Sequence, residues 1–213
     1  MSETHRSFIP AASVDWLLPL YDPIQKLLLG DGAYRRLVEQ AHLQPHHRVL
    51  EIGCGTANVT ILLKRLHPQV EVVGLDPDPK ALARARRKSQ RNAVSIHFDR
   101  GFADELPYPD ASFDRVLSSL MFHHLTLTEK TKTLVEARRV LAPGGSMHLL
   151  DFGGAHVHSE GLLAHLFHRR EQFHDNTGDR IPDLMRSAGF ADASEVGDAV
   201  TLFGRLAYWR AAV

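Results

Sequence analysis

The stretch from Val49 to Asn58 constrains the fold more than any other part of this sequence. It opens with a short apolar run, passes through Gly53 and Gly55, and leads into residues 59–66, whose apolar positions recur at helical spacing. This order predicts a buried strand, a glycine turn and a helix. In an open parallel sheet, the turn after a strand is where a nucleotide-like ligand can contact the backbone, because glycine has no side chain to keep it away.

The residues around the two glycines exclude two common kinds of phosphate site. A dinucleotide fingerprint has a third glycine where this sequence has Asn58, and a P-loop continues with Gly-Lys-Ser/Thr, which does not follow here. Glu51 instead places a carboxylate two residues before Gly53. A carboxylate at the pocket rim repels a pyrophosphate but attracts a positively charged ligand, such as the ammonium and sulfonium groups of S-adenosylmethionine.

With Glu51, Gly53 and Gly55, the stretch resembles the first motif of the class I S-adenosylmethionine-dependent methyltransferases, acidic-x-Gly-x-Gly. The chain also resembles that family in Phe113-Asp114-x-Val116, and residues 138–145 match its Arg-x-Leu-x-Pro-Gly-Gly element. The resemblance covers residues 37–190, with a weaker similarity to quinone-type methyltransferases at residues 21–22. It implies an α/β fold with a Rossmann-like, doubly wound sheet of seven mostly parallel strands and an antiparallel edge hairpin.

Asp76 ends the second predicted strand, residues 70–76, and lies 25 positions after Glu51. Doubly wound folds place a carboxylate near this position to accept hydrogen bonds from ribose hydroxyls. The alternative role for Asp76 is to cap the helix that begins near Pro77, a role that Asp78 could also fill. The resemblance implies further cofactor contacts at Gly53, Cys54, Gly55, Asn58, Pro77 and Ser118.

The segment after the third predicted strand, residues 94–98, resembles the family's adenine-side motif, Gly-Asp-Ala followed by Leu-Pro and an aromatic residue. Phe102 stands where the family has its aspartate. Phe102 could stack on the adenine ring, with the Ala103 amide meeting a ring nitrogen and Asp104 or Asp99 accepting from the amino group.

His123 and His124 follow the fourth predicted strand, residues 112–119, at the edge where methyl donor and acceptor should meet. Methyl transfer from a sulfonium needs mainly alignment of the reactants, and a base helps where the nucleophile begins protonated. Both histidines are candidate bases, although His124 could simply be the family's helix-start residue. The Asn/Asp-Pro-Pro-Tyr signature of nucleic-acid amino methyltransferases is absent from this segment.

Composition narrows the class of partner. Lys plus Arg and Asp plus Glu both number 25, which argues against a dedicated nucleic-acid binder, so the basic residues of the predicted helix 79–90 are interpreted as a solvated face. Because Cys54 is the single cysteine, the chain cannot form an internal disulfide. The small side chain of Cys54 suits the glycine turn, so a packing role is preferred to a redox or nucleophilic role. No signal peptide and no apolar run long enough to span a bilayer are found, so a cytoplasmic location is expected, and a homodimer is compatible with the sequence.

The remaining segments complete one expected domain of 213 residues. Residues 1–44 form a helical cover in which Trp16 and Tyr21 either line the substrate space or pack onto the sheet. Residues 45–151 form the cofactor-binding core, residues 152–180 a substrate lid, and residues 181–213 a helix and a hairpin with strands at 193–196 and 200–209. Between them lie a helix at 129–141 and a strand at 146–151.

Five histidines gather in the expected lid: His156, His158, His165, His168 and His174. His165 and His168 share a helix face at a spacing that can hold a metal ion. No cysteine or clear carboxylate partner lies near them in the sequence, so a lid helix is preferred and no metal is predicted.

The function that these features predict is S-adenosylmethionine-dependent methyl transfer to the oxygen, nitrogen or carbon of a small-molecule acceptor. The alternative is a non-catalytic module that binds S-adenosylmethionine or S-adenosylhomocysteine and acts through a partner. Phe102 keeps this alternative open, because it replaces the family's usual adenine acceptor.

Overall fold

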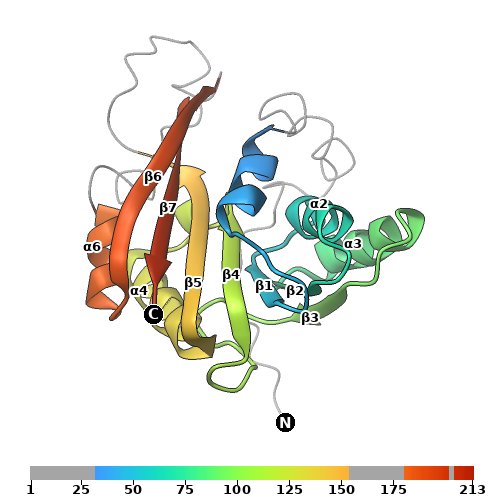
Figure 1. Cartoon of the computed structure of the whole chain (residues 1–213), viewed down its shortest axis with the longest axis horizontal. Coiled ribbons are helices and arrows are strands. Elements are labelled where there is room, and N and C mark those ends of the chain that lie inside the picture. Colours follow the sequence, from blue (N-terminus) through green and yellow to red (C-terminus); the bar gives the residue numbers. More distant parts are fainter. Residues whose placement is uncertain (1–31, 154–179, 202–203) are drawn as a thin grey trace.

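One mixed sheet organises the computed structural model, which describes residues 32–153, 180–201 and 204–213. Its strands lie in the order β3-β2-β1-β4-β5-β7-β6 (Figure 1). The strands are β1 Arg48–Ile52, β2 Glu71–Asp76, β3 His97–Arg100, β4 Phe113–Ser119, β5 Leu141–Phe152, β6 Ala191–Thr201 and β7 Gly204–Ala212. Strands β1 to β5 are parallel, whereas β7 runs antiparallel to β5 and β6 antiparallel to β7. The predicted doubly wound sheet with an antiparallel edge hairpin is confirmed.

Helices cover both faces of this sheet (Figure 1). A helix of residues 32–40 precedes α2 Asn58–Leu66, α3 Pro79–Arg91, the 3-10 turn η2 Phe122–His124, α4 Leu127–Val140 and α6 Arg180–Ser187. The first three helices pack on one face, and α4 and α6 on the other. Because helices return the chain between the parallel strands, the carboxyl ends of β1, β2, β4 and β5 meet at one edge. None of the helices in the described ranges is long and apolar enough to cross a bilayer.

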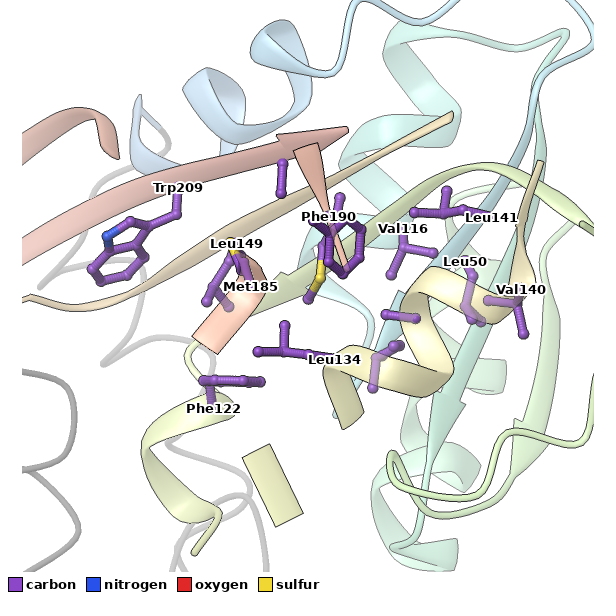
Figure 2. Close-up of a cluster of buried hydrophobic side chains, with 14 of the residues drawn as sticks. Leu50, Val116, Phe122, Leu134, Val140, Leu141, Leu149, Met185, Phe190 and Trp209 are labelled. Atoms are coloured by element: carbon purple, nitrogen blue, oxygen red, sulfur yellow. The ribbon is translucent and has the colours of Figure 1, made fainter. Parts of the chain in front are cut away.

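The apolar core between the sheet and helices α4 and α6 includes Phe122, the first residue of η2. Phe122 is fully buried and belongs to the same apolar cluster as Leu134 of α4, Met185 of α6 and Leu149 of β5 (Figure 2). Full burial of a side chain of this size stabilises the fold by about 1.5–3 kcal/mol. Phe122 therefore anchors the short turn that carries His123 and His124.

The start of α4 is set by a capping box. The Thr126 hydroxyl accepts from the Glu129 backbone N–H at 3.4 Å, and the Glu129 carboxylate accepts from the Thr126 backbone N–H at 2.9 Å. These reciprocal bonds satisfy donors that the first turn of a helix leaves without partners. As a result, α4 begins at Leu127, two residues before the predicted start.

Several predicted strand boundaries are wrong. The strand predicted at 146–151 spans Leu141–Phe152, and the strand predicted at 193–196 spans Ala191–Thr201. Strand β3 begins at His97 and not at residue 94, because Val94 and Ile96 pack against the buried apolar cluster under α3 instead of pairing with β2. The strand predicted at 200–209 begins too early, since Val200 pairs with Arg205 as part of β6. Apolar residues continue through the segment that joins β6 to β7, so the sequence pattern does not show where β6 ends and β7 begins.

Two regions with sequence predictions lie outside the described residues. They are residues 1–31, where a helical cover with Trp16 and Tyr21 is predicted, and residues 154–179, where a lid with five histidines is predicted. The helix of residues 32–40 buries Tyr34, Leu37 and Val38 against the sheet.

Candidate active site at the carboxyl edge of the sheet

The glycine turn after β1 requires glycine for two reasons. Gly53 and Gly55 have φ angles of +71° and +51°, which L side chains rarely adopt. A Cβ on Gly53 would also lie 2.4 Å from Met121 Cγ and 2.8 Å from Met121 Cβ. The turn is held by Leu75, whose carbonyl accepts from the N–H groups of Gly53 and Cys54 at 2.8 and 3.0 Å. The segment that follows β4 therefore packs directly on the turn that follows β1.

Glu51 is a buried carboxyl at the end of β1, with only 2% of its surface exposed. Its Oε1 accepts from the Ser119 hydroxyl at 3.1 Å, and within the described residues its Oε2 has no hydrogen-bond partner. Burial raises the pKa of Glu51 to about 8, against smaller opposing effects that include the Ser119 hydrogen bond. A buried acceptor without a donor costs about 1–3 kcal/mol. A bound cation with N–H groups would remove that cost.

Asp76 ties the ends of β1 and β2 together. Its Oδ2 accepts from the Gly55 backbone N–H at 2.8 Å, and its Oδ1 accepts from the Asp78 backbone N–H at 2.9 Å. The helix-capping role belongs to Asp78, whose Oδ1 accepts from the Lys80 backbone N–H. Burial raises the pKa of Asp76 to about 6, although the two backbone donors oppose this shift. Each Asp76 oxygen keeps acceptor capacity for a ligand hydroxyl.

Three of the predicted cofactor contacts have side chains that serve the packing of the protein. The Cys54 side chain is buried under α3, and burial raises the pKa of its thiol well above the usual value. Lys88 donates to the Asn58 side chain. Ser118 is fully buried on the α4 side of the sheet. A ligand in this turn would meet the backbone of Cys54 and not its sulfur, while Asn58 and Ser118 stay predictions.

The adenine-side segment adjoins Asp76. The Gly101 backbone N–H donates to the Asp76 carbonyl at 3.3 Å, and the turn beyond it contains the half-buried residues Phe102, Ala103 and Asp104. Asp99 accepts from the Tyr108 hydroxyl at 2.9 Å and contacts His97. Tyr108 and His97 therefore already engage Asp99, and both Asp99 and Asp104 stay predicted acceptors for the adenine amino group. Pro77, half-buried, lies between Asp76 and the Asp78 cap.

His123 contacts a residue that the sequence did not single out. Its Nδ1 lies 2.7 Å from Asp151 Oδ1, and its backbone N–H donates to Asp151 Oδ2 at 3.1 Å. Asp151 is fully buried near the end of β5. Burial alone would raise the pKa of its carboxyl, but His123 and two backbone N–H groups outweigh burial and hold the pKa below its usual value. The ring of His124 lies beside that of His123, with centroids 4.0 Å apart.

Several known proteins are similar to this chain. A family model described as a methyltransferase domain matches residues 49–145. The demethylmenaquinone methyltransferase of Deinococcus radiodurans is 42% identical over 139 residues, which are 64% of this chain and 57% of that protein. The enzyme of the same name from Thermus thermophilus is 35% identical over 158 residues, 72% of this chain and 70% of that protein.

Among solved structures, phosphoethanolamine N-methyltransferase 2 of Haemonchus contortus, in complex with S-adenosyl-L-methionine, superposes with a TM-score of 0.78. It is 15% identical, and the match covers 100% of this chain and 61% of that one, so the likeness concerns the fold alone. The chain belongs to the class I S-adenosylmethionine-dependent methyltransferases. Within that class, it is of the quinone methyltransferase type.

The chain spans just over half the length of the Deinococcus relative. The residues present fit the family's cofactor, since Glu51 offers a buried oxygen without a donor and Asp76 offers acceptors at the next strand end.

Proposed function

We propose that this chain transfers the methyl group of S-adenosylmethionine to a small-molecule acceptor. The observation that carries the proposal is the buried Glu51 carboxyl beside the glycine turn, with Asp76 at the neighbouring strand end. A cationic ligand beside this carboxyl would favour its ionised form and so meet an opposite charge, whereas the phosphates of a dinucleotide would disfavour that form. A sulfonium nucleoside has the complementary charge.

The proposed cofactor contacts follow from the positions of these side chains. Glu51 would pair with the cationic amino acid part, and Asp76 would accept from the ribose hydroxyls. Phe102 and the Ala103 amide would contact the adenine, and the backbone of residues 53–55 would border the ligand. When bound, S-adenosylmethionine supplies an electrophilic methyl group on sulfur.

In catalysis the protein would align the two reactants and exclude water. It would also take up a proton where the methyl acceptor carries one. Alignment of bound reactants can supply about 7–11 kcal/mol of the barrier reduction. We propose His123 or His124 as the base, because η2 follows β4 at the edge where the cofactor is expected.

The acceptor that we propose is a quinone-type ring in its reduced, hydroxyl-bearing form. The relatives from Deinococcus and Thermus carry the name demethylmenaquinone methyltransferase, which supports an acceptor of that class. We also propose that the chain forms a single domain, is located in the cytoplasm and forms a homodimer. Light scattering on the purified chain tests the homodimer.

The second candidate function is a module that binds the cofactor or its product and acts through a partner. Phe102 favours it, because the chain lacks the family's adenine acceptor at this position.

Calorimetry with S-adenosylmethionine, followed by a mass-spectrometric screen of reduced naphthoquinones and other small acceptors, separates the two candidates. Binding together with an acceptor gain of one methyl group supports the enzyme. Tight binding without turnover on any acceptor supports the module, and absence of binding contradicts both.

A further inference from the structure

Two histidine–carboxylate pairs occur in the part of the chain that the structure describes, and they differ sharply in environment. His97 and Asp99 lie 2.9 Å apart with side-chain exposures of 71% and 30%. His123 and Asp151 lie 2.7 Å apart with exposures of 9% and 1%. Exposed pairs contribute little to stability, whereas burial of a carboxylate is expensive unless its oxygens are satisfied. The buried pair therefore needs an explanation.

The Asp151 carboxylate accepts from three donors. Oδ1 contacts Nδ1 of His123 and accepts from the Phe152 backbone N–H at 2.7 Å, and Oδ2 accepts from the His123 backbone N–H. An ionised carboxylate only accepts hydrogen bonds, so the proton of the neutral imidazole resides on Nδ1. Nε2 is then the nitrogen through which His123 accepts a further proton.

The surroundings hold the imidazole in one place. Phe122 fixes η2 in the core shared with α4 (Figure 2), and the ring of Phe152 meets the His123 ring edge-on with centroids 5.1 Å apart. Met121 packs on Gly53, so η2 lies beside the glycine turn. The geometry is that of an oriented base at the edge where the proposed cofactor would bind.

We propose that Asp151 is a positioning residue that orients His123 as the base of the reaction, and that the acceptor enters with an ionisable hydroxyl group. This inference rests on the proposed methyl transfer. The hydroxyl proton passes to Nε2 of His123, and the electron pair of the broken O–H bond stays on the acceptor, which becomes the nucleophile. The carboxylate of Asp151 balances the charge of the imidazolium, and the proton leaves to solvent after the methyl group has been transferred.

The first test needs no substrate. In ¹⁵N-edited NMR spectra of the resting protein, His123 is expected to show the tautomer protonated on Nδ1, and Asp151→Asn is expected to remove this preference. The matched control is Asp183→Asn, which breaks the exposed ion pair with Arg186 on α6 and should leave the His123 signals unchanged. A His123 tautomer that is the same in Asp151→Asn and the wild type overturns the positioning role.

The second test is kinetic. Asp151→Asn is expected to lower kcat by about 10²–10⁴-fold, the usual contribution of a positioned base. The loss should shrink towards zero for acceptors substituted so that their hydroxyl is already ionised at the assay pH. A merely structural role predicts an equal loss for every acceptor, and that result would overturn the inference.

Two further measurements keep the outcomes distinct. S-adenosylmethionine affinity by calorimetry should agree within about twofold among wild type, Asp151→Asn and the Asp183→Asn control, since the change lies outside the proposed cofactor contacts. If Asp151→Asn does not fold, His123→Gln should show the same dependence on acceptor acidity. A wild type that binds the cofactor but methylates nothing contradicts the proposed function, while the NMR result still decides the orientation of His123.

Discussion

The Gly55 backbone N–H donates to Oδ2 of Asp76 at 2.8 Å, so the acid at the end of β2 closes the glycine turn at the end of β1. Asp78, two residues on, performs the separate task of capping α3. The two acids thus have different structural tasks, closure of the glycine turn and capping of α3, and variants at the two positions should differ in their effects.

Asp76→Ala should weaken S-adenosylmethionine binding at least tenfold, because loss of two accepted backbone bonds loosens the turn and the proposed ribose acceptor disappears; about 1.4 kcal/mol corresponds to each factor of ten. Asp78→Ala should lower the free energy of unfolding by about 1 kcal/mol through loss of the cap and leave affinity within about twofold. Calorimetry and urea unfolding measure the two quantities. Equal affinity in Asp76→Ala and wild type would refute the assignment.

Glu51→Gln should stabilise the ligand-free protein, and the more so at higher pH. Burial raises the pKa of Glu51 to about 8 from an ordinary value of 4.5, so between these values the folded protein holds a proton that the unfolded chain has lost. The contribution of Glu51 to stability is therefore fully present below pH 4.5 and is lost as pH rises through 8. Asp76 titrates in both proteins, and the difference between them isolates Glu51.

Urea unfolding at several pH values should show little difference between Glu51→Gln and wild type at pH 5 and an advantage for the variant on the order of 5 kcal/mol at pH 9. A difference that does not change with pH would mean that Glu51 ionises normally in the folded protein.

Gly53→Ala and Gly144→Ala form a matched pair. Both glycines have φ angles in the left-handed region, +71° and +77°, but a Cβ on Gly144 meets nothing within 4 Å, whereas one on Gly53 meets Met121. Gly144→Ala should cost only the backbone strain, about 1–2 kcal/mol. Gly53→Ala should cost about 1–3 kcal/mol more, because Met121 Cβ and Cγ must move. Similar unfolding free energies for both variants would show that Met121 and η2 move without a measurable loss of stability.

Thr126→Ala should lower the free energy of unfolding by about 1 kcal/mol through loss of the capping box at the start of α4. Glu129→Ala should cost less after Thr126→Ala than in the wild-type background, because the two side chains satisfy the helix start together. A double-mutant cycle measured by urea unfolding checks this. Strict additivity of the two changes would argue that the box contributes nothing as a unit.

Local sequence determined much of this fold. The apolar run before Gly53, the helical spacing after Asn58 and the Pro-Gly-Gly element at 143–145 act through neighbouring residues, because strand, turn and helix preferences depend on side chains a few positions apart. Periodicity failed where apolar residues packed outside the strands, as Val94 does beside α3. It also failed where it ran through the hairpin, as at Val200.

Tertiary structure alone decided which side chains meet at the carboxyl edge. His123 lies 28 positions from Asp151, and Ser119 lies 68 positions from Glu51, yet both pairs are within hydrogen-bond distance. No local pattern encodes these contacts, because they depend on the strand order β1-β4-β5, which places distant segments side by side. The sequence by itself therefore determined the kind of ligand that the first turn can accept, through the charge of Glu51. The packing of β4 against β5 decided which of the two histidines contacts Asp151, because within the described residues a buried carboxylate meets an imidazole at that place.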